Sequence, residues 1–150
     1  MFRISFITLV LCGTSSGCAG IFPSAPTVLT TCSFDQAWTI ALTSVNEFEL
    51  RRVDKVRGAI ETEWLLFDSK RLAGMFTRNE NKERMRFFVT LSRKPTAIQI
   101  ETFQIREYFS PMGLQSQKGW RRISPNEDEE QRLANRISNR LKAKGCTIQS

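Results

Sequence analysis

The chain has 150 residues, with 22 Lys and Arg against 15 Asp and Glu, four Cys and no His. This length fits one domain, and a hydrophobic share of 41% with a charged share of 25% excludes a disordered or collagen-like chain. The absence of histidine excludes a Ser-His-Asp or Cys-His catalytic site, an imidazole metal ligand and an imidazole pH switch. The sequence therefore does not indicate a reaction, but it does indicate the location and the fold of the protein.

The first 17 residues have the order of a secretory signal peptide. Arg3 supplies a positive charge, an apolar run covers residues 4–11, and small residues follow as far as Gly17. The run is much shorter than the ~20 apolar residues that a membrane-spanning helix needs. A buried N-terminal strand is the alternative, but no following segment offers such a strand a partner. We therefore expect residues 1–17 to be a signal peptide.

A cysteine follows this signal at the position where a lipid would be attached. Residues 16–19 (SGCA) resemble the bacterial lipobox, in which the cysteine becomes the acylated first residue. Ser15 stands where a leucine is usual, so secretion without an anchor is the alternative to lipidation at Cys18. Several acyl chains on Cys18, such as palmitate, would give stable membrane attachment. Ala19 is not the aspartate that signals inner-membrane retention, which favours the periplasmic face of the outer membrane. Residues 18–26 are expected to form a short lipidated tether.

A strand and a helix are expected next. Residues 27–31 (TVLTT) are β-branched and apolar, which favours a strand. Ser33 and Gln36 have the spacing of a capping box, in which each side chain bonds the backbone amide of the other residue. Apolar residues then recur at i, i+4, i+7, i+8 and i+11. This spacing predicts a helix over residues 34–46 with Trp38 on its buried face.

Four further strands are expected where apolar and charged residues alternate. Their ranges are 47–54, 59–66, 84–91 and 97–109. Residues 55–58 (KVRG) are expected to form the turn between the first two of these strands. In the last strand the apolar residues change parity between Ile100 and Phe103. This change predicts a β-bulge or twist near Thr102.

A long C-terminal helix closes the expected domain. Residues 110–123 are typical of a loop, and Ser124 and Glu127 have the spacing of a second capping box with Pro125 at the first helical position. Acidic residues at the start of this helix and basic residues at its end suit the helix dipole, and Gly145 is the expected stop. Its apolar stripe consists of Leu133, Ile137 and Leu141.

The expected order is therefore β-α-β-β-β-β-α over residues 27–150. Antiparallel hairpins with one polar face need a cover on the other face only, and two helices can supply it. We expect an α+β fold with a single helix-grip-like domain, in which a curved antiparallel sheet packs on the long C-terminal helix.

Two cysteines, Cys32 and Cys146, remain after the expected processing. They come just before the first expected helix and just after the last. In an oxidising compartment two such cysteines often pair, so a disulfide is slightly favoured over two free buried thiols.

The middle of the chain is basic, and four arginines on expected strands define its basic interaction face: Arg51, Arg52, Arg84 and Arg86. On an exported protein such a face would meet anionic lipid headgroups, lipopolysaccharide or an acidic partner. The export signal argues against nucleic acid. A solvated sheet face without a partner explains the same residues.

No arrangement of residues predicts catalysis. Glu61 and Glu63 share a face of one expected strand and could act as acid and base, but solvent-facing strand positions explain them as well. Gly113 and Gly119 do not form a phosphate loop, and no serine stands in a G-x-S-x-G motif. We expect a protein that is not an enzyme, with no cofactor, no metal and no small-molecule substrate.

Several short runs are similar to a known family. The run SFDQAW at residues 33–38, the helix after it, FEL at residues 48–50 and RGAI at residues 57–60 resemble the helix-grip domain of the BamC-like (NlpB/DapX) lipoproteins. The resemblance covers residues 27–145 in element order, although this chain has one such domain where the family has two. It implies an outer-membrane lipoprotein that is an accessory in β-barrel protein assembly, with no catalytic residues.

These observations lead to an expected function. The chain would be an exported cell-envelope lipoprotein that acts as a non-enzymatic interaction or accessory module with an envelope protein as partner. The alternative is a small-ligand or lipid carrier that uses the groove between the sheet and the C-terminal helix, lined by Leu133, Ile137 and Leu141.

Overall fold

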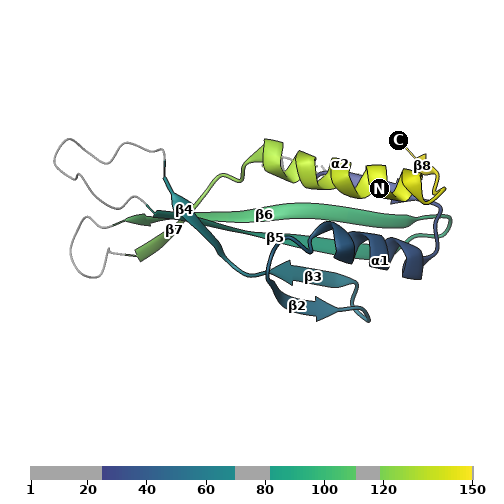
Figure 1. The fold of residues 1–150 in the computed structure, drawn as a ribbon, viewed down its shortest axis with the longest axis horizontal. Helices are drawn as coiled ribbons and strands as arrows, with labels where there is room; N and C mark the ends of the chain where they lie inside the picture. The colour runs from purple at the N-terminus through teal and green to yellow at the C-terminus, as the bar shows by residue number, and fades with distance from the viewer. Residues whose placement is uncertain (1–24, 70–81, 111–118, 150) are drawn as a thin grey trace, which may run out of the picture.

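A computed structural model describes residues 25–69, 82–110 and 119–149 (Figure 1). The expected signal peptide and the proposed lipidation residue Cys18 lie outside the described residues. The strands are β1 (Thr27–Thr30), β2 (Leu50–Asp54), β3 (Ala59–Thr62), β4 (Leu65–Asp68), β5 (Lys82–Arg93), β6 (Ile98–Ser110), β7 (Gly119–Ile123) and β8 (Ile148–Gln149). The helices are α1 (Phe34–Ser44) and α2 (Glu127–Ala143).

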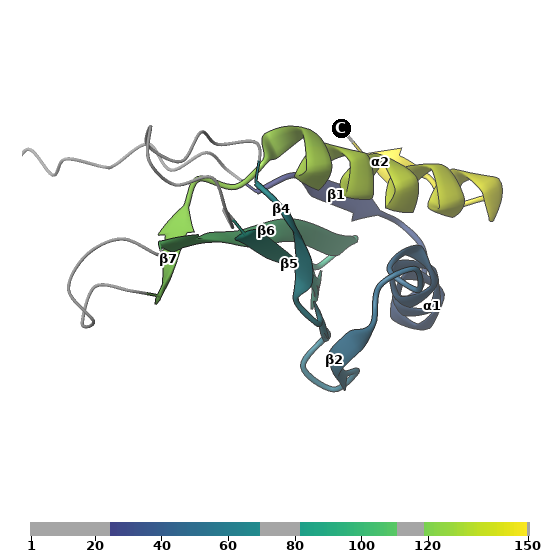
Figure 2. The same ribbon diagram turned by 60° about the vertical axis from the view of Figure 1, so that its left-hand side comes forward.

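The described strands form one open antiparallel sheet of 8 strands. Its main path runs β2-β3-β5-β6-β1-β8, while β4 pairs with β5 and β7 pairs with β6. Figure 1 shows the far ends of β5 and β6 projecting beyond the helices together with β4 and β7. Figure 2 shows α1 and α2 on the same face of the sheet. The expected α+β class and the packing of the C-terminal helix on the sheet are therefore confirmed.

Local hydrogen bonds explain where α1 begins. The Ser33 Oγ accepts a hydrogen bond from the Gln36 amide at 3.3 Å, and the Ser33 amide donates to the Gln36 Oε1 at 3.3 Å. The expected capping box is thus confirmed. The helix ends at Ser44, two residues before the expected end at residue 46.

The start of α2 differs from the expected one. Asn126, not Ser124, is the N-cap, because its side chain accepts from the Asp128 amide at 3.2 Å. The Asn126 amide in turn donates to the Gln104 Oε1 on β6 at 2.9 Å, which holds the cap against the sheet. Pro125 therefore precedes the cap instead of opening the helix. The predicted stop is correct, since Gly145 follows the C-cap with a φ of 80°.

The hydrophobic core lies between the sheet and the two helices. Leu133, Ile137 and Leu141 of α2 are all buried, so the stripe that was considered as the lining of a ligand groove packs into this core. The same core contains buried residues of α1, β1, β3, β5 and β6, including Trp38, Val28, Ile60, Val89 and Ile100.

Of the bulge or twist expected near Thr102, the bulge is wrong. The pairing of β5 with β6 runs without a shift from Glu83 opposite Tyr108 to Arg93 opposite Ile98. The change of apolar parity has another cause, because Phe103 lies on the opposite face of the sheet and stacks on Phe88 with ring centroids 4.7 Å apart. When apolar residues lie on both faces of a strand, the sequence shows the same change of parity that a β-bulge would produce.

Two other expected segments are corrected. The single strand over residues 59–66 is divided into β3 and β4, with a break where the Glu63 amide donates to the Glu49 carbonyl at 2.7 Å. The expected loop over residues 110–123 contains β7, which pairs along the end of β6. The short strand β8 was also not expected, and it pairs with β1.

The turn after β2 requires a glycine at its last position. Gly58 has a φ of 65°, and a Cβ atom there would lie 2.2 Å from the Leu91 carbonyl oxygen. The Leu91 amide donates to the Gly58 carbonyl at 2.7 Å. The turn can therefore approach β5 this closely only because residue 58 has no side chain.

Candidate functional site

The four predicted basic residues all lie on the two strands where they were expected, but each meets an acidic partner. Arg51 and Arg86 both pair with Glu61 on β3, and the Arg51–Glu61 distance is 3.5 Å. Arg52 pairs with Asp54 at 3.1 Å. These contacts join β2, β3 and β5 across the helix-free face of the sheet, which we call the outer face.

Two of these arginines are further enclosed by aromatic rings. The Arg84 guanidinium lies between Trp64 and Trp120, at 4.1 Å and 4.2 Å from the ring centroids, and also pairs with Glu107 at 2.6 Å. Arg86 lies over the Trp64 ring at 4.4 Å, and its side chain is only 17% exposed. Such stacked cations stabilise the sheet through cation–π attraction. Arg84 and Arg86 therefore serve mainly to hold the outer face together.

Only one of the two carboxylates considered for acid–base chemistry lies on a strand. Glu61 lies on β3 between the two arginines that bind it, whereas Glu63 falls in the break between β3 and β4. The Glu61 carboxylate already pairs with two guanidinium groups, and these contacts occupy an oxygen that would otherwise face a substrate. Glu61 is consequently a structural residue of the outer face.

A buried polar cluster lies where α2 begins. Glu130 is 6% exposed, and its carboxylate accepts a hydrogen bond from the Gln104 amide at 2.6 Å. Nearby on β5, Glu83 is almost fully buried and binds the Arg106 Nε at 2.7 Å. These interactions satisfy polar groups that would otherwise be costly to bury. The bond to Glu130 attaches α2 to β6, and the Glu83–Arg106 pair joins β5 to β6.

Burial raises the pKa of Glu130, the hydrogen bond from Gln104 opposes this rise, and the neighbouring charge of Glu127 adds to it. Because the pKa of Glu130 is higher in the folded state than in the unfolded state, its contribution to stability is greatest at acidic pH. That contribution is lost as pH rises through the folded pKa. We therefore expect Glu130→Gln to be more stable than the wild type at neutral pH, while the two are nearly equal near pH 4.

Denaturant unfolding across this pH range tests the prediction. Asp128→Asn is the matched control, since it removes one negative charge from the same turn but from an exposed side chain. Its stability should keep the pH dependence of the wild type. A Glu130→Gln protein that is less stable than the wild type at every pH would show that the ionised carboxylate supports the fold.

A groove of about 330 Å³ lies beside this cluster, at the start of α2 near β4. It is lined by Leu65, Leu66, Phe67, Met85, Arg106, Asn126 and Glu129. The residues of β4 give it an apolar wall, and Leu66 is exposed there. This groove differs from the expected one, which would have run under Leu133, Ile137 and Leu141.

The contact between the two helices uses two arginines of α2, of which Arg140 was expected only to suit the helix dipole and Arg136 had no expected role. The Arg136 Nη1 donates to the Ser44 carbonyl at 3.1 Å and also pairs with Glu47. Arg140 donates to the Thr43 carbonyl. Since α1 has no basic residue in its last turn, these groups from α2 satisfy its terminal carbonyls. The signal available in the sequence was a basic residue at every fourth position: Arg132, Arg136, Arg140 and Lys144.

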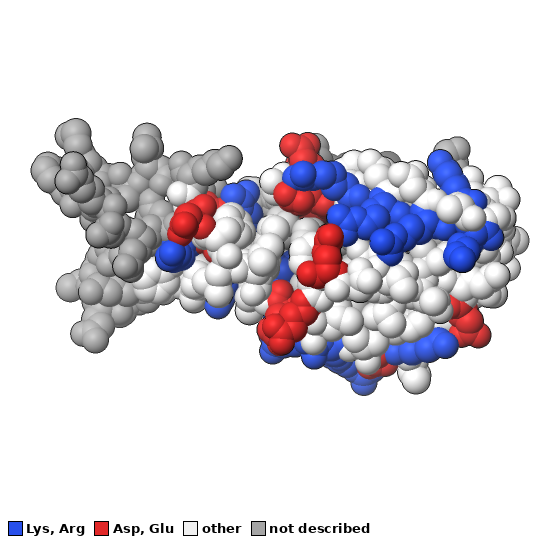
Figure 3. Space-filling model, viewed as in Figure 1, with Lys and Arg blue, Asp and Glu red and all other residues white. Residues whose placement is uncertain are grey.

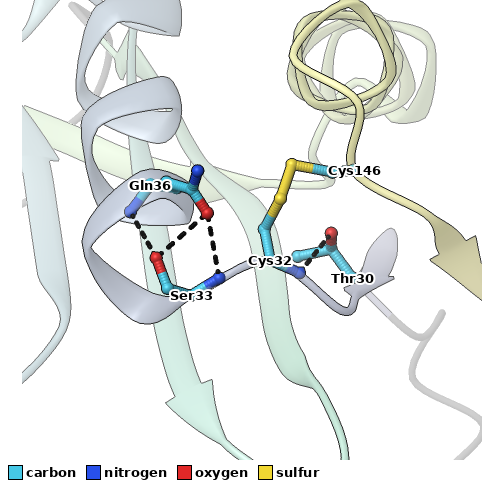
Figure 4. Close-up of a disulfide and its surroundings, with 5 residues drawn as sticks. All are labelled: Thr30, Cys32, Ser33, Gln36 and Cys146. Carbon is cyan, nitrogen blue, oxygen red and sulfur yellow. Dashed lines mark hydrogen bonds between the residues drawn. A yellow bond between two sulfur atoms is a disulfide. The ribbon is translucent and has the colours of Figure 1, made fainter.

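The disulfide that the sequence slightly favoured is present in the structure. Cys32 and Cys146 are bonded across 114 residues, with their Cα atoms 5.3 Å apart (Figure 4). Cys32 lies between β1 and the capping box of α1, and its amide contacts the Thr30 Oγ1 at 3.4 Å. The bond therefore ties the start of α1 to the end of α2.

The described residues show neither a group of metal-binding side chains nor a helix that could span a membrane. Among residues 25–69, 82–110 and 119–149, no group of three or more His, Cys, Asp or Glu is arranged to hold a metal ion. No helix within these same ranges has the length and apolar character needed to cross a membrane.

Comparison with known proteins does not place the chain in a family. No family model matches it, and no curated protein matches it.

Proposed function

We propose that this protein is an exported cell-envelope lipoprotein, anchored through Cys18, that acts as a non-enzymatic interaction or accessory module at the periplasmic face of the outer membrane. The disulfide between Cys32 and Cys146 carries this proposal. Such bonds persist in exported proteins and are rare in the cytosol, where thiols are kept reduced. The disulfide and the signal-like order of residues 1–17 both support export of the chain.

The arrangement of the domain supports a helix-grip assignment. A helix of 17 residues, α2, packs along a sheet of antiparallel strands, and α1 lies beside it. This agrees with the resemblance to BamC-like lipoproteins, and on that basis we propose an accessory role in the assembly of β-barrel proteins. The partner would be another protein of the envelope.

A non-enzymatic role is supported by the way the charged side chains are used. The outer face brings Glu61 together with Arg51 and Arg86, and Glu107 with Arg84, so its acids and bases neutralise one another. Groups paired in this way stabilise a surface and leave little freedom for proton transfer.

The groove beside β4 supports a second candidate, a carrier of a small apolar ligand. Its volume of about 330 Å³ lies at the lower end of the range for small-molecule sites, and Leu65, Phe67 and Met85 supply apolar walls. An unidentified ligand that copurifies in stoichiometric amount, and is lost on Phe67→Ala, would favour the carrier over the interaction module.

The lipid anchor gives the direct test of the proposed function. We expect the chain expressed in a Gram-negative bacterium to be found in the membrane fraction, and mass spectrometry to show an acylated N-terminal Cys18. Cys18→Ala should lose the acyl chains and the membrane association. Cys12→Ala is the matched control, because Cys12 lies inside the apolar run of the signal and should leave processing unchanged. A mature N-terminus at another residue would refute the anchor.

A further inference from the structure

The last turns of α2 carry a positive charge that the rest of the described molecule does not neutralise. Arg140, Lys142 and Lys144 are all exposed, and we call these three residues the basic end of α2. Within residues 25–69, 82–110 and 119–149, none of the three forms an ion pair with an acidic side chain. Figure 3 shows Lys and Arg gathered along α2 and toward α1. The basic end of α2 therefore places three cations without an acidic partner among the described residues within five residues of one helix, whereas the four arginines of the outer face are paired.

A groove adjoins this end of the helix. It measures about 360 Å³ and is lined by Lys144 together with Asp35, Gln36, Thr39 and Ile40 of α1. Asp35, its one acidic residue, is already paired with Lys55 at 2.8 Å. The groove thus offers an ammonium group beside a partly apolar wall, a combination that suits an anionic headgroup with its adjoining glycerol and acyl carbons.

The position of the tether brings a membrane within reach of this surface. The Pro26 carbonyl accepts from the Thr102 amide at 3.1 Å, and the Thr102 hydroxyl contacts the Glu130 carbonyl, so the chain enters the domain beside the first turns of α2. The distance along α2 from Glu130 to Lys144 is about 21 Å, at 1.5 Å per residue. Residues 18–26 can span at most about 29 Å. An anchor at Cys18 would therefore keep the basic end close to the lipid surface.

We infer that the basic end of α2 is a contact surface for anionic phospholipid headgroups and orients the domain on its membrane. The inference rests on the proposed function, because the lipid anchor at Cys18 would bring the basic end of α2 near a membrane. The unpaired charge of the basic end does not depend on the anchor. Each basic residue near an anionic surface adds attraction that falls off over a Debye length, so the contact weakens as salt rises.

Vesicle binding of the mature chain tests this inference. The chain from residue 18 onward is exported behind a cleavable signal as the Cys18→Ser variant, so that the disulfide forms and no acyl chain contributes. Cosedimentation with vesicles of phosphatidylcholine alone is compared with vesicles that also contain phosphatidylglycerol. We expect binding to the anionic vesicles only, lost at high salt. Lys142→Gln/Lys144→Gln should weaken it about 30-fold, because two cations are removed.

The control removes the same charge elsewhere. Arg57→Gln/Arg122→Gln changes two exposed residues, in the β2–β3 turn and on β7, and should alter binding by less than about threefold. Equal losses in both variants would mean that net charge acts without a defined surface, and this would overturn the inference. Absence of wild-type binding to anionic vesicles would also overturn it, in favour of an acidic protein partner. An unacylated Cys18 in cells would refute the anchor but leave the vesicle result standing.

Discussion

Replacement of both Cys32 and Cys146 by alanine is expected to lower the free energy of unfolding by about 4–5 kcal/mol. The bond closes a loop with a sequence separation of 114 residues, and the restriction that a cross-link places on the unfolded chain grows with loop length. It also fixes the junction at which β1, α1 and α2 meet. A loss of this size is a large part of the total stability of a small domain.

Urea unfolding of the oxidised wild type, the reduced wild type and the double variant measures this effect. The reduced wild type and the double variant should unfold at nearly the same midpoint, well below that of the oxidised protein. The Cys18→Ser variant serves as the control, since it removes a cysteine outside the pair. If the double variant were as stable as the oxidised wild type, the disulfide would contribute nothing to the fold.

Trp38→Ala is expected to destabilise the protein by about 3–5 kcal/mol. Trp38 is 5% exposed at the centre of the buried face of α1, where it packs in the core and against Phe34 with ring centroids 6.2 Å apart. Truncation removes its transfer free energy and leaves a cavity that the neighbouring residues fill only in part. Thermal and denaturant unfolding should both report the loss.

Trp64→Ala provides a control with the same change of side chain. Trp64 is half-buried on the outer face, where its ring contacts Arg84 and Arg86. Because these are contacts at a partly exposed surface, we expect a smaller loss of about 1–2 kcal/mol. A Trp38→Ala protein with the midpoint of the wild type would show that the helix-covered face of the sheet is not the main core.

Features that depend on nearby residues could be predicted from the sequence. The capping box at Ser33 and Gln36, the spacing of apolar residues in α1 and the glycine stop at Gly145 all involve groups within a few positions of each other. The two long central strands were recognised because alternation persists over many residues. Shorter elements such as β7 and β8 were not recognised, since two to five residues carry little pattern and form strands only through their partners β6 and β1.

The sequence by itself determined the α+β class, the buried faces of both helices, the excess of positive charge and the positions of the two cysteines. Only the tertiary structure decided which of the charges are neutralised. Arg84 meets Glu107 because the sheet register places them opposite each other. Arg86 reaches Glu61 diagonally, because Glu61 lies opposite Phe88, two residues along β5. Among the residues that the structure describes, no acidic side chain pairs with the basic end of α2. The composition gives only the number of charges. The Coulomb attraction between two charges depends on their distance, which the fold determines.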